Sequence, residues 1–169
     1  MQLLNAAANF TRNRQDLKNI YLTFIRSILE QSAVVWHSSL TKKNRRDLER
    51  IQKSAVRVIM GSSYKSYKES LKELRLNSLE KRREILCLRF AKKCLKNEKF
   101  KSLFPLNKTN HKMTKRNQRK HQTRKIKTTR FENSAIPYMT KLLNTLLFFY
   151  KKLFYKKVSL IFAEKLRNP

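Results

Sequence analysis

The sequence is poor in the residues that turn a chain and in the residues that carry negative charge. It contains one glycine and three prolines in 169 residues. Hairpins and sandwiches need turn residues at every reversal, so this scarcity excludes an architecture of strands and tight turns. The sequence therefore predicts a nearly all-α protein.

Most arrangements of residues that carry out catalysis are also missing. Polymerase-type phosphoryl transfer needs clustered carboxylates that hold two divalent ions about 4 Å apart. The only aspartates, Asp16 and Asp47, fall on different predicted elements, and no glycine-rich phosphate loop exists. His37, His111 and His121 are not spaced with the cysteines as zinc ligands would be. We therefore expect no catalytic residue, no metal and no cofactor, and we interpret His37 as a polar helix end beside a buried tryptophan.

Cysteine is scarce as well. Cys87 and Cys94 are seven residues apart on one face of a predicted helix, so they are expected to be reduced core thiols rather than a disulfide. The first fifteen residues contain no apolar stretch long enough for a secretory signal. These observations predict an intracellular protein that is not secreted.

Positive charge is abundant. Lysine and arginine number 41 against 11 acidic residues, which gives a formal charge of +30. Such a chain repels itself unless a polyanion is near, and nucleic acid is the first candidate, with an anionic membrane second. The apolar run 142–150 falls far short of the ~20 residues that a membrane span needs. We expect a nucleic-acid partner and no membrane span.

The apolar residues recur at helical spacing. Helices are predicted over about 15–37 and 43–60, with Thr41 as N-cap and Gly61 as stop, and they are expected to pack as an antiparallel hairpin. A third long helix is predicted over 78–96. The residues expected to be buried are Leu17, Phe24, Ile28, Leu48, Ile51, Ala55 and Phe90. The predicted fold is a small helical bundle.

Two of these helices carry a basic face. The first follows the spacing i, i+4, i+7, i+11 and spans about 16 Å; it consists of Arg46, Arg50, Lys53 and Arg57. The second consists of Lys81, Arg82, Arg89, Lys92, Lys93 and Lys96. A solvated surface is the alternative for each face, but two such faces in so basic a protein favour contacts with a nucleic-acid backbone. Tyr64 and Tyr67 are candidates to stack on unpaired bases.

The composition divides the chain into three parts. A helical domain is expected over 1–98 and a C-terminal helix and tail over 134–169, with Pro137 in the first turn of that helix. Between them, a basic linker is expected over 99–133, and its part from Lys99 to Phe131 contains 12 basic residues and no acidic ones. Most of this stretch lacks apolar periodicity, so we expect a mostly disordered basic linker.

Three short runs resemble a known family. They are Phe24-Ile-Arg-Ser-Ile-Leu-Glu30, Val35-Trp-His37 and Leu48-Glu-Arg-Ile-Gln-Lys53. In this order they are similar to the C-terminal region of reverse transcriptases from jockey-type non-LTR retrotransposons. The resemblance covers about residues 3 to 144 and lies in the thumb and post-thumb region.

The resemblance implies a part of an RNA-directed DNA polymerase that grips template and primer, with the palm and fingers as partners and the nucleus as location. The Tyr-x-Asp-Asp box of the palm is absent, so we expect no polymerase activity from this chain alone, and we interpret it as truncated at its N-terminal side. Two alternatives stay open: a free-standing RNA- or DNA-binding protein, for example one associated with ribosomes, and a degenerate copy without selected function. RNA or DNA preference and oligomeric state are left undetermined.

Overall fold

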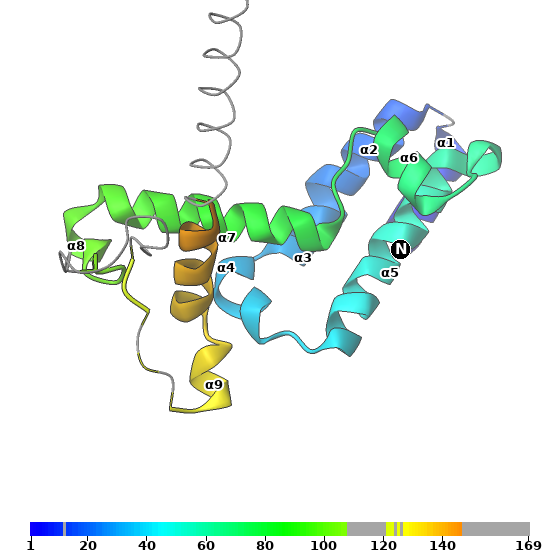
Figure 1. Cartoon of the computed structure of the whole chain (residues 1–169). Helices are drawn as coiled ribbons and strands as arrows, with labels where there is room; N and C mark the ends of the chain where they lie inside the picture. The colour runs from blue at the N-terminus through cyan, green and yellow to red at the C-terminus, as the bar shows by residue number, and fades with distance from the viewer. Residues whose placement is uncertain (12, 108–120, 124, 126, 147–169) are drawn as a thin grey trace, which may run out of the picture. The chain divides into compact units, whose positions relative to one another are not determined.

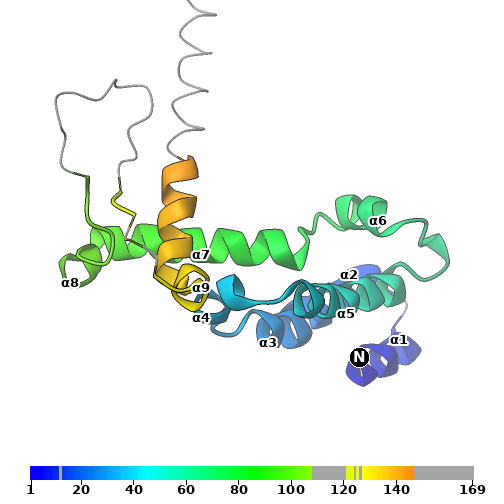
Figure 2. The same cartoon turned by 60° about the horizontal axis from the view of Figure 1, so that its bottom comes forward.

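The computed structural model describes residues 1–11, 13–107, 121–123, 125 and 127–146 (Figures 1 and 2). Its named elements in these ranges are all helical, which confirms the predicted all-α class. The chain divides into two compact units, Met1–Cys87 and Leu88–Pro169. This division falls inside a helix and lies earlier than the boundary near residue 98 that the sequence predicts.

Among its described residues, the first unit contains five α-helices of one to three turns and one long helix, together with one π-helix and two 3₁₀ turns. In chain order they are α1 (Gln2–Phe10), α2 (Arg14–Ile20), the π-helix η1 (Tyr21–Ile25), α3 (Arg26–Glu30), α4 (Ala33–Trp36), the 3₁₀ turn η2 (His37–Ser39), α5 (Lys42–Met60), the 3₁₀ turn η3 (Gly61–Ser63) and α6 (Tyr67–Glu73). The helix α7 (Leu79–Lys96) begins in this unit and ends in the next. The second unit adds α8 (Glu98–Lys101), α9 (Thr129–Glu132) and a helix over 135–146.

The predicted antiparallel hairpin is present, but its first arm is interrupted. α5 packs against α1, α2 and α6, and the hydroxyl of Tyr21 donates a hydrogen bond of 2.9 Å to the side chain of Gln52. The two arms lie together at α2 and separate towards α4 (Figure 1). Ser32 has a positive φ of 52°, and this left-handed residue ends the first arm before α4 begins.

The π-helix explains why two residues expected in the core are exposed. Phe24 and Ile28 are 59% and 72% exposed, whereas the next residues along, Ile25 and Leu29, are half-buried. A π-turn contains about one residue more than an α-turn. The wider turn already shifts the helical face within η1, where Phe24 lies, and it rotates the residues that follow, including Ile28, by about 100° relative to an uninterrupted helix. The buried face therefore moves on by one residue.

The caps of α5 and α6 follow their sequence signals. The Thr41 hydroxyl accepts a hydrogen bond from the Asn44 amide, and α5 ends where Gly61 takes a positive φ of 54°. At α6 the Ser66 hydroxyl accepts from the Glu69 amide and donates to the Glu69 carboxylate. Both helix starts are therefore fixed by local side-chain hydrogen bonds.

The first unit has its own apolar core. The buried cluster consists of Leu4, Leu17, Tyr21, Ala55, Val56, Ile59, Met60 and Leu74. Two of the expected core residues, Leu17 and Ala55, belong to it, while Leu48 and Ile51 are half-buried. The last three turns of α5 therefore contribute its buried residues to the core, and the rest of its surface is polar.

α7 buries the two cysteines as expected, but its buried face is centred differently from the one that the apolar pattern predicts. Ser78 caps it by accepting from the Lys81 amide, and its buried residues are Leu79, Arg83, Cys87, Ala91 and Cys94. Phe90, which was expected in the core, is 44% exposed. The true spacing of four, four, four and three residues still defines a single helical face, but this face includes an arginine that the apolar pattern does not reveal.

The second unit contains ordered structure inside the predicted linker. Phe104 and His121 are buried, and the His121 ring nitrogen Nδ1 lies 3.2 Å from the Phe104 carbonyl oxygen. The Asn144 side chain accepts from the His121 amide and donates to its carbonyl. The described parts of 99–133 therefore contain ordered structure, and the expectation that the linker is mostly disordered stays a prediction. Residues 108–120, 124 and 126 lie outside the described residues, as does the tail from 147.

Candidate nucleic-acid interface

The four cations on α5 lie together on one face, as the sequence predicts. Their side chains are all exposed and are spaced over three turns; they belong to Arg46, Arg50, Lys53 and Arg57. The same helix buries Ala55 and Ile59 in the core, which fixes the rotation of α5 about its axis. Core packing therefore keeps this set of side chains, called the α5 stripe below, turned towards solvent.

Three members of the α5 stripe are electrostatically uncompensated. Among the described residues, no carboxylate lies within ion-pair distance of Arg46, Lys53 or Arg57. Arg50 contacts Asp47 at 3.2 Å, but both side chains are well exposed and such pairs contribute little. A phosphate can therefore compete with Asp47 for Arg50 at small cost.

One end of the α5 stripe is aromatic. The guanidinium carbon of Arg57 lies 5.4 Å from the centre of the Tyr64 ring, and Tyr64 itself packs against the core of the first unit. Tyr67 donates its hydroxyl to Glu49 and is half-buried. Both tyrosines that the sequence offered for base stacking are thus engaged within the protein.

The six cations predicted on α7 differ among themselves. Lys81 lies 3.4 Å from Glu84, and Arg82 is half-buried and contacts Glu30 at 3.0 Å. These two belong to the first unit. Arg89, Lys92, Lys93 and Lys96 are exposed on the later half of the helix, in the second unit. Only these last four form a solvent-facing basic set comparable to the α5 stripe.

Sequence reasoning missed a buried arginine. Arg83 is fully buried, and its Nε donates to His37 Nδ1 at 3.3 Å. Its guanidinium lies over the Trp36 ring at 5.8 Å, and its two terminal nitrogens have no hydrogen-bond partner in the described structure. His37, which was interpreted as a polar helix end, is thus itself buried. Trp36, which was expected to be buried beside it, is half-buried. The spacing of Arg83 from Leu79 and Cys87 is the one sequence signal that would have placed it inside.

Burial and charge together lower the pKa of His37 to about 4. Desolvation is the larger cause, and the guanidinium of Arg83 adds to it, followed by that of Arg45. His37 is therefore neutral at pH 7, which suits its role as hydrogen-bond acceptor for Arg83. The pair is a structural connection between η2 and α7 in the first unit.

The cysteines are buried and free, as expected. Burial raises the pKa of Cys87 to about 11 and raises the pKa of Cys94 as well. The thiolate is the form that reacts with electrophiles and metals, so neither thiol is activated. Among the described residues no group of three metal-binding side chains gathers either.

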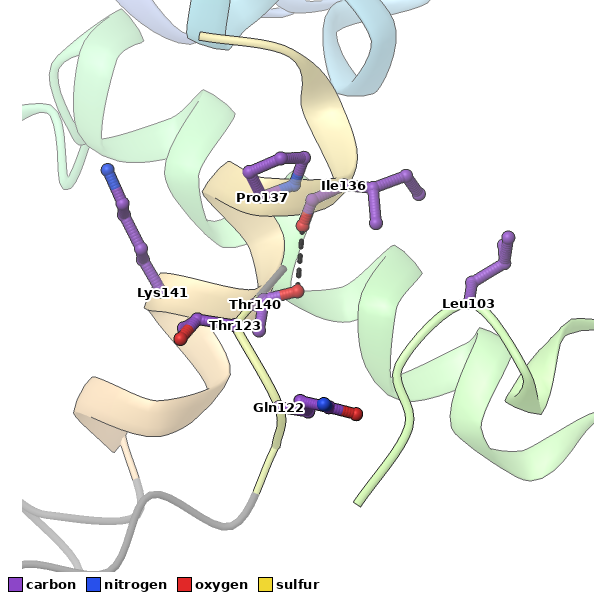
Figure 3. A pocket seen from close by; sticks show the side chains of 7 residues that line it. All are labelled: Leu103, Gln122, Thr123, Ile136, Pro137, Thr140 and Lys141. Carbon is purple, nitrogen blue, oxygen red and sulfur yellow. Dashed lines mark hydrogen bonds between the residues drawn. The ribbon is translucent and has the colours of Figure 1, made fainter. Parts of the chain in front are cut away.

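Two concave sites in the described part of the chain are small or open to solvent. A cavity of about 20 Å³ lies in the second unit and is lined in part by Leu103, Pro137 and Lys141 (Figure 3). This is room for about one water molecule, whereas small-molecule sites enclose about 300–1,000 Å³. A larger depression of about 480 Å³ near Ile28 and Leu86 is open to solvent. The exposed cations are therefore the better candidate for a functional surface.

Comparison with protein-family models, with curated proteins and with solved structures found no match to this chain. None of the described helices is long and apolar enough to cross a membrane.

Proposed function

We propose that this protein binds nucleic acid through the phosphate backbone, with the α5 stripe as the principal contact surface. The observation that carries the proposal is the exposure of Arg46, Lys53 and Arg57 without acidic partners among the described residues. Each such cation that contacts a phosphate releases a condensed counterion, which supplies affinity that does not depend on sequence.

The shape of the surface favours backbone contacts over base reading. Base-specific recognition requires side chains that a docking element carries into a groove. The α5 stripe is nearly straight and only about 16 Å long, and α5 is held against α1 and α2 by the core. Such a row of ammonium and guanidinium groups can contact a row of phosphates, so little sequence preference is expected.

The resemblance to jockey-type reverse transcriptases suggests the wider setting. In that setting the chain is the thumb and post-thumb region of the polymerase, and its stripe holds the template and primer while the palm carries out the chemistry. An adjacent upstream reading frame that encodes a palm with a Tyr-x-Asp-Asp box would support this assignment. A stable product made without such a frame would favour the free-standing nucleic-acid-binding protein, for which the separate core of the first unit is the supporting observation.

The proposal is tested by the salt dependence of binding. Arg46→Gln with Lys53→Gln removes two unpaired cations from the α5 stripe, and the log–log slope of affinity against salt on duplex DNA should flatten by about two units. The matched control is Lys68→Gln with Lys72→Gln, which removes the same charge from exposed positions of α6. If both double variants change the slope equally, the α5 stripe is only a solvated face.

The basic stretch 107–133 is the competing source of affinity. Lys115→Gln with Arg116→Gln removes two of its charges and leaves the α5 stripe intact. A loss of slope confined to this variant would assign the binding to that stretch. A loss confined to the Arg46 and Lys53 variant would assign it to α5.

A further inference from the structure

We propose that Arg57 is a stacking platform for an unpaired base, so that the α5 stripe prefers single-stranded nucleic acid to duplex. The inference rests on the proposed function, since it specifies which form of nucleic acid the same surface takes. It starts from the pair that Arg57 forms with Tyr64 at the end of α5, where the guanidinium lies 5.4 Å from the ring centre.

The tyrosine holds the arginine in place. Tyr64 is half-buried and packs against the core of the first unit, and the 3₁₀ turn η3 that precedes it is joined to α5 by the hydrogen bond from the Gly61 amide to the Arg57 carbonyl. The ring is therefore fixed relative to the helix that carries Arg57. A guanidinium on such a ring is pre-organised, because stacking and cation–π attraction limit its rotamers.

The other side of the guanidinium is available. The Arg57 side chain is exposed, and among the described residues no carboxylate pairs with it. A planar guanidinium supported on one side by an aromatic ring offers its second side to a base, in the way that proteins stack unpaired bases on arginine and aromatic planes. Lys53, one turn earlier on the same stripe, is placed to contact the neighbouring phosphate.

The same geometry discriminates between single strands and duplexes. In a duplex each internal base is covered on both faces by its neighbours, so Arg57 cannot stack on a base there. A single strand offers both phosphate and base face, and stacking adds affinity that the duplex does not gain. Every base has such a face, so the preference is independent of sequence.

The test compares Arg57→Lys with Arg46→Lys. Both variants keep the charge of the α5 stripe, but only the first removes the planar guanidinium that lies over the Tyr64 ring. Binding of the full chain is measured at one salt concentration to a fluorescent single-stranded oligonucleotide, in RNA and DNA forms, and to a duplex of equal length. Arg57→Lys should weaken binding to the single strands by about fivefold or more and change duplex binding by less than twofold. Arg46→Lys should change neither by more than twofold.

Two further single-stranded oligonucleotides test the stacking directly. With 2-aminopurine in the single strand, the parent should quench its fluorescence on binding and Arg57→Lys should not. A strand with abasic positions should bind the parent and Arg57→Lys equally. Equal losses on single strand and duplex, or no loss at all, would overturn the stacking proposal while leaving backbone binding in place. Absence of any salt-dependent binding by the parent would overturn both proposals together.

Discussion

α5 and α7 have nearly the same length and the same charge, but they use that charge differently. They contain 19 and 18 residues, and each has seven basic and two acidic side chains, a net +5. α5 buries only Gln52 and apolar residues and exposes its stripe, whereas α7 buries Arg83 and holds Arg82 against Glu30. Equal composition therefore does not mean equal availability, because packing decides which cations remain free for a partner.

The largest effect is expected where α5 enters the core. Ile59 is 2% exposed, so Ile59→Ala should lower the free energy of unfolding by about 3–4 kcal/mol through lost burial and the cavity left behind. Phe24 is 59% exposed, and Phe24→Ala should cost less than about 1 kcal/mol. Denaturant unfolding of both variants measures the difference. A cost at Phe24 as large as that at Ile59 would contradict the exposed position of Phe24 within η1.

The polar anchor of α7 should make stability depend on pH. His37 has a pKa of about 4 when folded and an ordinary value of about 6.5 when unfolded. The unfolded chain therefore binds more protons between these values. The stabilisation that comes from burying neutral His37 is fully present above about pH 6.5. As the pH falls towards 4 it is lost, and the free energy of unfolding decreases by up to about 3 kcal/mol.

The variant His37→Gln isolates this contribution, because glutamine still accepts a hydrogen bond from Arg83 and does not titrate. Between pH 6.5 and 4.5 its free energy of unfolding should fall less steeply than that of the parent. Arg45 and Glu80, which also act on His37, are unchanged in both proteins. Parallel pH profiles of the two proteins would show that His37 is protonated as easily in the fold as outside it.

Substitutions of Arg83 are expected to change stability by an intermediate amount. Arg83→Ala removes its contacts with His37 and Trp36 and leaves a cavity, whereas Arg83→Met fills most of the volume and removes a buried charge whose terminal nitrogens are unpaired. We expect the methionine variant to be more stable than the alanine variant by about 2 kcal/mol. Thermal unfolding followed by circular dichroism measures this difference, and equal stability would mean that the charge, not the volume, is what the site requires.

The smallest effect concerns Arg82. Arg82→Gln breaks a half-buried ion pair with Glu30 and should cost about 1 kcal/mol of stability. It should leave the salt dependence of nucleic-acid binding as it is, because this side chain is already paired. Arg89→Gln, at an exposed position, should leave stability nearly unchanged and should reduce the salt dependence of nucleic-acid binding. A change in salt dependence at Arg82 would place it back among the binding residues.

The parts of the fold that local signals determine were predictable. Thr41, Gly61 and Ser66 mark helix ends through their own backbone and side-chain hydrogen bonds, and the spacing of the α5 stripe is a direct consequence of helical periodicity. These features need only the few residues around them. The sequence therefore predicted α5 and its exposed cations to within one residue.

The features of the fold that the sequence did not predict depend on residues distant in sequence or on small changes in helical geometry. A single π-helix over Tyr21–Ile25 rotates the residues after it, and no apolar pattern signals that rotation. Arg83 is buried because His37 and Trp36, more than forty residues earlier, receive it. Likewise His121 in the basic linker is held by hydrogen bonds with the Asn144 side chain, a contact that composition cannot reveal.

The chain has one glycine, yet among the described residues three backbone positions have positive φ: Ser32, Gly61 and Arg75. At Ser32 and Arg75 the side chain costs roughly 1–2 kcal/mol relative to a relaxed backbone. These are therefore two positions for raising thermal stability by protein engineering. Asparagine tolerates the left-handed region and, unlike glycine, does not loosen the unfolded chain. Ser32→Asn and Arg75→Asn lie outside the α5 stripe, so the gain in stability leaves that surface unaltered.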